Sequence, residues 1–205
     1  EEILGVLNPN GSAATVQLSF LLSNGTTYRS VLTVGPHSNE LLDISTLPQF
    51  PVGQPYSVLY TSDVPVSVSE QSGAFGEGLG TTLSDRGFTL WGFGEGFRPS
   101  GDGSSVTETL QLFNPNSTDV LVEITIRFDN NLGQETFRQV VPARKSTVTN
   151  IHNFVTGNRV NVLAYYGLTV KAADPIVASM IHFDSFFPGA FTTLGTPLGI
   201  SAPIV

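Results

Sequence analysis

The chain repeats part of its own sequence, and this repeat constrains the fold more than any other feature. The tripeptide Asn-Pro-Asn occurs at residues 8–10 and again at residues 114–116, each time after an apolar segment. At the same spacing, the apolar residues at 16–22 fall on those at 122–128, and in both runs apolar and polar side chains alternate. Alternation with a period of two is typical of a half-buried β-strand. The sequence therefore predicts two copies of one strand-forming unit.

Turn residues separate the expected strands. Ser-Asn-Gly follows the first alternating run, and Asp-Asn-Asn-Leu-Gly stands at the matching place in the second copy. Asn and Gly adopt positive φ at low cost, so both segments suit hairpin turns. Many short strands without a sustained helical period predict an all-β fold, namely two tandem antiparallel β-sandwich domains related by internal duplication. The strands are expected near residues 3–8, 14–22, 27–34, 38–44, 56–62, 65–71, 88–94, 107–113, 120–128, 135–141, 145–151, 159–166, 168–173 and 176–183.

A glycine-rich stretch at residues 73–87 is the expected boundary between the copies. It predicts a first β-sandwich repeat at residues 1–87 and a second at residues 88–205. Further segments match across this boundary with a slowly growing offset, as small loop insertions would produce. The matching segments are residues 34–36 with 140–142, 63–66 with 173–176, and 81–83 with 192–194.

Composition excludes several classes of function. The chain has 17 acidic and 9 basic residues and a net charge of −8, so a nucleic-acid partner is not expected. It has no cysteine, which excludes disulfides, thiolate metal sites and cysteine nucleophiles. No segment approaches the roughly 20 apolar residues of a membrane span, so membrane insertion is not expected. The first residues also lack the pattern of a signal peptide.

The sequence predicts no enzyme. It contains no nucleophile elbow, phosphate loop or zinc-protease helix, and its three histidines lie in separate segments. His182 and Asp184 are two residues apart and would share one face of a strand, where they could contact a ligand or serve a metal-dependent hydrolase. An exposed polar pair is the simpler interpretation. Glu95, flanked by glycines, is a further candidate ligand contact, or else a structural acceptor of backbone N–H bonds.

Calcium is the one cofactor that the sequence leaves open. Asp129, Asn131 and Glu135 surround Gly133 and offer oxygen ligands, although an ordinary hairpin turn explains them equally simply. A looser acidic group is formed by Glu95, Asp102 and Glu108. No other cofactor or metal is expected.

Two features suggest contact with other proteins. Phe186 and Phe187 are adjacent in an expected loop, where both rings cannot easily point inward. Arg144 and Lys145 form a basic cluster with Arg127 and Arg138 in the otherwise acidic chain, which could support docking between units.

Five segments of the second half resemble two related groups of proteins. They are residues 91–96, 110–115, 122–126, 141–145 and 174–177. One group is the sensory rhodopsin transducer family, small soluble β-sandwich proteins that assemble as oligomers. The other is a set of tandem β-sandwich modules in bacterial cell-surface proteins. Residues 182–185 also resemble the late motif of the transducer family, with His182 where that family usually has arginine.

The presence of two copies favours the resemblance to surface modules. This resemblance implies a non-catalytic structural or interaction module of an exported bacterial surface protein or extracellular assembly. Its partners would be copies of itself or neighbouring modules, joined through strand edges and loops. The transducer resemblance implies the alternative, a carbohydrate or small-ligand binding module that acts in signalling.

Overall fold

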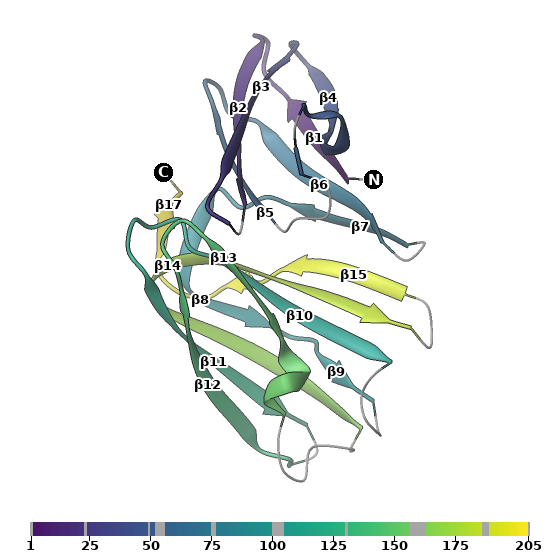
Figure 1. Cartoon of the computed structure of the whole chain (residues 1–205), viewed down its shortest axis with the longest axis vertical. Helices are drawn as coiled ribbons and strands as arrows, with labels where there is room; N and C mark the ends of the chain where they lie inside the picture. Colours follow the sequence, from purple (N-terminus) through teal and green to yellow (C-terminus); the bar gives the residue numbers. More distant parts are fainter. Residues whose placement is uncertain are drawn as a thin grey trace. The chain divides into compact units, whose positions relative to one another are not determined.

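Antiparallel strands make up most of the chain in the computed structural model (Figure 1), which confirms the all-β fold. The chain divides into two compact units, Glu1–Leu83 and Ser84–Val205, and the division falls within the glycine-rich stretch. Each unit is described by itself below. The structure describes residues 2–22, 24–48, 50–51, 56–74, 77–99, 105–129, 131–155, 163–185 and 189–204.

Unit 1 consists of two antiparallel sheets around one apolar core. One sheet has the strand order β4-β1-β6-β7 and the other has the order β3-β2-β5. Alternate residues of β2, from Val16 to Leu22, are buried, so the predicted inward face of this strand is confirmed. Leu4 and Val6 reach the same core from the other sheet. The strands are β1 (Glu2–Asn8), β2 (Ala14–Leu22), β3 (Thr27–Val34), β4 (Ser38–Asp43), β5 (Tyr56–Ser62), β6 (Ser67–Ala74) and β7 (Glu77–Thr82).

Unit 2 has the same strand order, but a single strand, β14 (Ala164–Asp184), serves both layers (Figure 1). Residues 166–172 of β14 pair with β11 on one side, and part of this run pairs with β8 on the other. Residues 177–184 pair with β10 and β15. The other strands are β8 (Arg86–Phe93), β9 (Phe97–Arg98), β10 (Val106–Phe113), β11 (Val120–Phe128), β12 (Gln134–Val141), β13 (Ser146–Asn150), β15 (Gly189–Leu194), β16 (Thr196–Pro197) and β17 (Ser201–Pro203).

Trp91 marks the place where β14 passes from one layer to the other. Its indole is fully buried, and the indole nitrogen donates a hydrogen bond of 2.8 Å to the carbonyl of Ile176. The ladder between β14 and β8 is irregular between Lys171 and Ile176. Pro175 lies in this interval, where its missing N–H interrupts no regular pairing.

The Asn-Pro-Asn motif ties the end of β10 to two neighbouring segments. Asn114 is fully buried, and its amide nitrogen donates to the carbonyls of Thr118 at 2.8 Å and Val141 at 2.9 Å. Its amide oxygen accepts from the backbone and side-chain nitrogens of Asn116, which in turn donates to the Pro175 carbonyl at 2.9 Å. Unit 1 has the matching set of bonds, in which Asn8 binds Ser12, Val34 and Asn10, and Asn10 binds Pro65. This correspondence is what a duplication predicts.

Strand pairing corrects part of the sequence alignment between the copies. Ala14 pairs with Val34 and Val120 pairs with Val141, so Val34 corresponds to Val141 rather than to the residue before it. The predicted match of residues 34–36 with 140–142 is therefore wrong by one residue. Pairing at β7 and β15 shifts the match of 81–83 with 192–194 by one residue as well.

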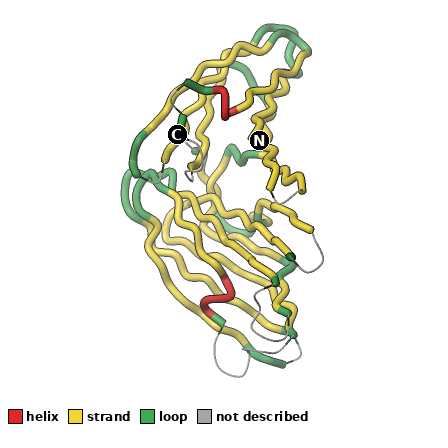
Figure 2. The backbone as a smooth tube through the Cα atoms, turned by 45° about the vertical axis from the view of Figure 1, so that its right-hand side comes forward, coloured by secondary structure: helices red, strands yellow, loops and turns green. Residues whose placement is uncertain are grey.

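Several predicted strand limits are also wrong. The expected strands at 168–173 and 176–183 are continuous in β14, because Pro175 falls at the irregular part of the ladder. Residues 159–162 of the expected strand at 159–166 lie outside the described residues. Four pairing strands, β7, β15, β16 and β17, were not expected, since they are short and carry little apolar alternation. Two short 3-10 helices, red in Figure 2, follow β4 and β13; they are η1 (Ile44–Thr46) and η2 (Ile151–Phe154).

Candidate functional site

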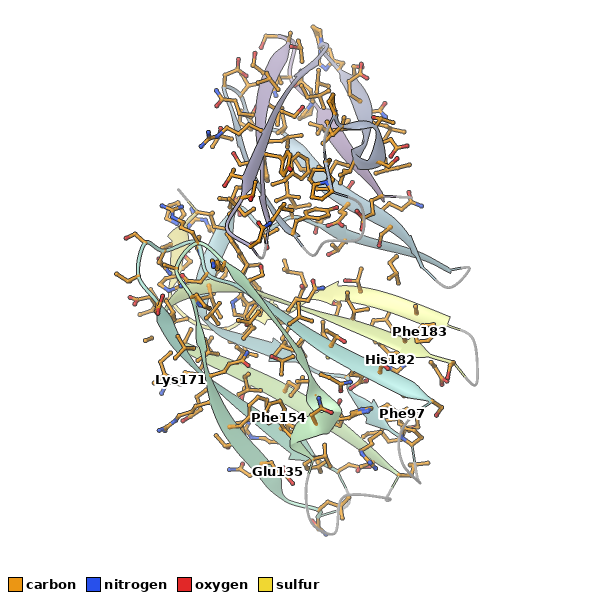
Figure 3. All side chains as sticks on the ribbon, viewed as in Figure 1. Phe97, Glu135, Phe154, Lys171, His182 and Phe183 are labelled. Carbon is orange, nitrogen blue, oxygen red and sulfur yellow. The ribbon has the colours of Figure 1, made fainter. Side chains whose placement is uncertain are left out.

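A buried carboxylate, Glu108, is the centre of the candidate site in unit 2. Glu108 lies on β10 at an inward-facing position between Val106 and Leu110, and its side chain is fully buried. One carboxylate oxygen accepts the Phe97 N–H at 2.8 Å and lies 2.9 Å from Nδ1 of His182. The other oxygen accepts the hydroxyl of Tyr166. Phe97 and His182, labelled in Figure 3, thus come from β9 and β14 to the same carboxylate.

His152 completes this group of side chains. The 3-10 helix η2 begins after Asn150, whose side chain accepts the His152 N–H at 3.0 Å and so fixes the first turn. The His152 ring nitrogen Nε2 lies 3.2 Å from the Phe97 carbonyl and 4.0 Å from Glu108. We name Glu108, His152, Tyr166 and His182 the Glu108 cluster.

Burial determines the protonation of the cluster. It raises the pKa of Glu108, the bonds from His182 and the Phe97 N–H oppose this rise, and the charge of Glu95 adds to it. Burial lowers the pKa of His152, and the nearby charges of Arg98 and His182 lower it further. Arg98 is itself buried, and among the described residues its Nε has no hydrogen-bond partner. The interior of unit 2 therefore favours a protonated Glu108 and a neutral His152.

Unit 1 has a counterpart of the tyrosine and carboxylate, but without the histidines. The Tyr56 hydroxyl donates to Glu2 at 2.9 Å, and the strand ladders place Tyr56 and Glu2 where unit 2 has Tyr166 and Glu108. Ser72 pairs with Glu2 as His182 pairs with Glu108. Burial and the carboxylates of Glu70 and Glu2 raise the pKa of Tyr56. The histidines are thus a feature of unit 2 added to a pair that both units share.

A pocket of about 340 Å³ lies beside the cluster. Its charged lining consists of Glu95, Arg127 and Asp129, and its aromatic lining includes Tyr165, whose side chain is 55% exposed. The Tyr165 ring rests against that of Phe97, with ring centroids 5.1 Å apart. Residues 94–96, 127–129 and 165–167 together line the pocket.

Tyr166 belongs to both the pocket and the Glu108 cluster. Its hydroxyl bonds to Glu108, whereas the residue also lines the pocket. The Tyr166 N–H donates to the Gly96 carbonyl at 2.9 Å, and a Cβ atom on Gly96 would overlap the Tyr166 ring. The pocket wall at residues 94–96 therefore packs directly on a side chain of the cluster.

The predicted ligand contacts lie at different places in this site. His182 is part of the cluster and stacks on Phe191, with ring centroids 4.9 Å apart, and Glu95 lines the pocket. Asp184, at the end of β14, pairs with Val106 and Gly189 in the strand ladders. Sequence reasoning gave Glu108 only as part of a loose acidic group and missed Tyr166 and His152. An acidic residue on the apolar face of an alternating strand was the signal for Glu108.

The predicted calcium loop is a hairpin turn in the structure. Asn131 and Gly133 have φ of 60° and 80°, and the Asp129 carboxylate accepts the Tyr165 N–H at 3.2 Å. In the described part of the chain, no group of three or more acidic, histidine or cysteine side chains could hold a metal ion. Asp102, from the second acidic group, lies outside the described residues.

The predicted interaction residues are only partly placed. Arg144 and Lys145 lie in the turn before β13, where the Arg144 N–H donates to the Asn116 carbonyl at 3.1 Å. Arg138 pairs with Glu123 at 2.7 Å, and Arg127 donates to Thr169 at 2.9 Å. Phe186 and Phe187 lie outside the described residues.

Comparison with known proteins identifies the family. Within the described residues, no helix has the length and apolar character needed to cross a membrane. A search of curated proteins returned no relative. Two solved structures are similar to this chain. "Crystal Structure of Thermotoga maritima 1070" is 18% identical, with a TM-score of 0.47, and the match covers 55% of this chain and 97% of that one. The "Anabaena sensory rhodopsin transducer" is 23% identical, with a TM-score of 0.36, and the match covers 45% of this chain and 92% of that one. The sequence model of the family described as "Anabaena sensory rhodopsin transducer" matches residues 86–194, more than half of the chain, and the protein therefore belongs to this family.

Proposed function

We propose that the protein is a non-catalytic binding module that takes a small hydroxylated ligand of the carbohydrate class in the pocket of unit 2. The observation that carries this proposal is the exposed Tyr165 ring next to Glu95 and Asp129 in one pocket. An aromatic ring offers an apolar face for the C–H groups of a sugar, and carboxylate oxygens accept bonds from its hydroxyls. The volume is within the usual range for small-ligand sites, which begins at about 300 Å³. Membership of a transducer family supports a role in signalling.

Removing the Tyr165 ring should weaken binding. We expect saturable binding of at least one of glucose, galactose, N-acetylglucosamine and mannose in isothermal titration calorimetry. Tyr165→Ala should weaken this binding about tenfold, since an aromatic contact contributes about 1 kcal/mol beyond its buried area. Tyr165→Phe keeps the ring and should bind within about twofold of the wild type.

Two results would contradict this assignment. One is a dissociation constant above about 10 mM for all four sugars. The other is unchanged affinity in Tyr165→Ala, which would place the bound sugar elsewhere on the protein.

A second candidate function, contact between copies of the chain, is favoured by an exposed apolar pair. Leu121 and Val140 face each other across the β11–β12 ladder, and each is 51% exposed. Two apolar side chains placed together on an outer sheet face suit a protein contact. In an extracellular assembly, such contacts would join neighbouring copies.

Light scattering tests this second candidate. We expect the apparent mass of the wild type to rise with concentration, and the double variant Leu121→Glu with Val140→Glu to stay at the lower mass, because the two charges would have to be desolvated. Val31→Glu, at an exposed apolar position of unit 1, is the control and should behave as the wild type. The same mass for all three proteins at every concentration would rule out this contact surface.

A further inference from the structure

The pocket and the Glu108 cluster share Tyr166, so a change in one must be felt by the other. The Tyr166 hydroxyl is held by Glu108, and the residue lines the pocket beside Gly96. We propose that proton uptake by Glu108 lowers the affinity of the pocket for its ligand, with Tyr166 as the link. This inference rests on the proposed binding function of the pocket.

The hydrogen bonds of Glu108 suit its ionised form. An ionised carboxylate only accepts hydrogen bonds, and here it accepts from the Phe97 N–H and the Tyr166 hydroxyl while His182 Nδ1 lies 2.9 Å away. A proton on Glu108 would bring an additional donor into this group. At least one of the present bonds must then reverse or break, and the Tyr166 hydroxyl can turn most easily because its hydrogen rotates freely.

The surrounding charges set the pH range of this change. A carboxyl group whose pKa is raised by burial takes up its proton at a higher pH than an exposed one, and this holds for Glu108. The charge of Glu95 pushes in the same direction, and the bond from His182 opposes it. His152 has a lowered pKa because of its burial and the charges of Arg98 and His182. Its positive charge is therefore withheld from the carboxylate until a lower pH than for an exposed histidine.

The change at Glu108 reaches the pocket through the contact between Tyr166 and Gly96. The backbone of Gly96 lies against the Tyr166 ring and is bonded to the Tyr166 N–H. When the hydroxyl is released from Glu108, the ring loses the bond that fixes its far end. The wall at residues 94–96 then loses a fixed support, and a binding site that is less preorganised binds more weakly.

Unit 1 offers an internal control for this inference. Tyr56 and Glu2 form the same kind of bond, but the ladder positions of the cluster histidine His182 and its unit 1 counterpart differ, with Ser72 in unit 1. Substitution of Tyr56 therefore removes an equivalent hydroxyl without touching the pocket of unit 2.

The experiment compares the wild type, Tyr166→Phe and Tyr56→Phe as full chains. The probe is whichever of the four sugars binds the wild type most tightly, measured at about pH 7.5 and about pH 5, the range over which buried titratable groups commonly change charge. We expect wild-type affinity to fall at least about fivefold between these values, a typical coupling between sites. Tyr56→Phe should show the same fall, and Tyr166→Phe should reduce it to less than about twofold. Carboxyl groups in the pocket itself are unchanged in Tyr166→Phe, so a full fivefold fall in that variant would overturn the inference.

A second measurement tests the link without any ligand. The backbone amide signals of Gly94, Gly96 and Gly167 are followed by NMR as the pH is lowered. We expect a common midpoint in the wild type that disappears in both Glu108→Gln and Tyr166→Phe. A midpoint that persists in Glu108→Gln would assign the change to another group and overturn the inference, as would the absence of any midpoint in the wild type. If the midpoint is present but no sugar binds, the link stands and only the proposed function fails.

Discussion

Replacing Asn114 with alanine should lower the free energy of unfolding of unit 2 by about 3 kcal/mol. The amide of Asn114 is fully buried and holds the carbonyls of Thr118 and Val141 and both nitrogens of Asn116. Alanine would leave these groups without their partner, and each buried unpaired group costs roughly 1–3 kcal/mol. Urea unfolding followed by tryptophan fluorescence measures the effect, because Trp91 is the single tryptophan and is buried in unit 2.

The neighbouring exposed residue Ser117 provides the control for this measurement. Ser117→Ala should change the free energy of unfolding by less than about 0.5 kcal/mol, as is usual for surface positions. If Asn114→Ala were as stable as Ser117→Ala, the Asn-Pro-Asn motif would be only a turn signal and not a structural tie.

The second large effect is expected at Gly96. A methyl group there would overlap the ring of Tyr166 and push it from its bond to Glu108. Gly96→Ala should therefore destabilise unit 2 by about 2 kcal/mol, as overpacking of a tight site does, and weaken sugar binding at least about tenfold. Urea unfolding and calorimetry with the same sugar measure the two effects.

Gly94, two residues earlier in the same pocket wall, is the matched control. A Cβ atom at Gly94 meets no other atom within 4 Å, so Gly94→Ala should keep stability within about 0.5 kcal/mol of the wild type. Equal losses in the two variants would mean that general stiffness of this segment matters, and not the contact of Gly96 with Tyr166.

The sequence predicted the strands best where alternation was strong. In β2 and β11, the apolar side chains from Val16 and Val122 onward face the core as expected. It failed at β14, because proline and glycine are ordinarily strand breakers and the irregular ladder that accommodates Pro175 is a tertiary feature. Likewise, the one-residue shift between the copies at Val34 and Val141 depends on pairing, which a linear comparison does not contain.

The candidate site was harder to predict than the fold. His182 and Glu95 were recognised as candidates, but their neighbours Glu108, Tyr166 and His152 come from three separate elements that only the folded sheets bring together. Glu108 alone carried a signal, a charge at an inward position of an alternating strand. Arg144 was chosen for its charge, whereas the structure gives it a backbone role, with a φ of 56° in the turn before β13.

The passage of β14 through both layers has a mechanical consequence for unit 2. A pulling force applied to one layer is carried to the other along a covalent backbone, without first crossing a loop. In unit 1 the corresponding run is divided into β5 and β6, so its layers are joined there by a connecting segment at residues 63–66. Unit 2 is thus built to resist shear between its layers, and unit 1 has a joint at the same position.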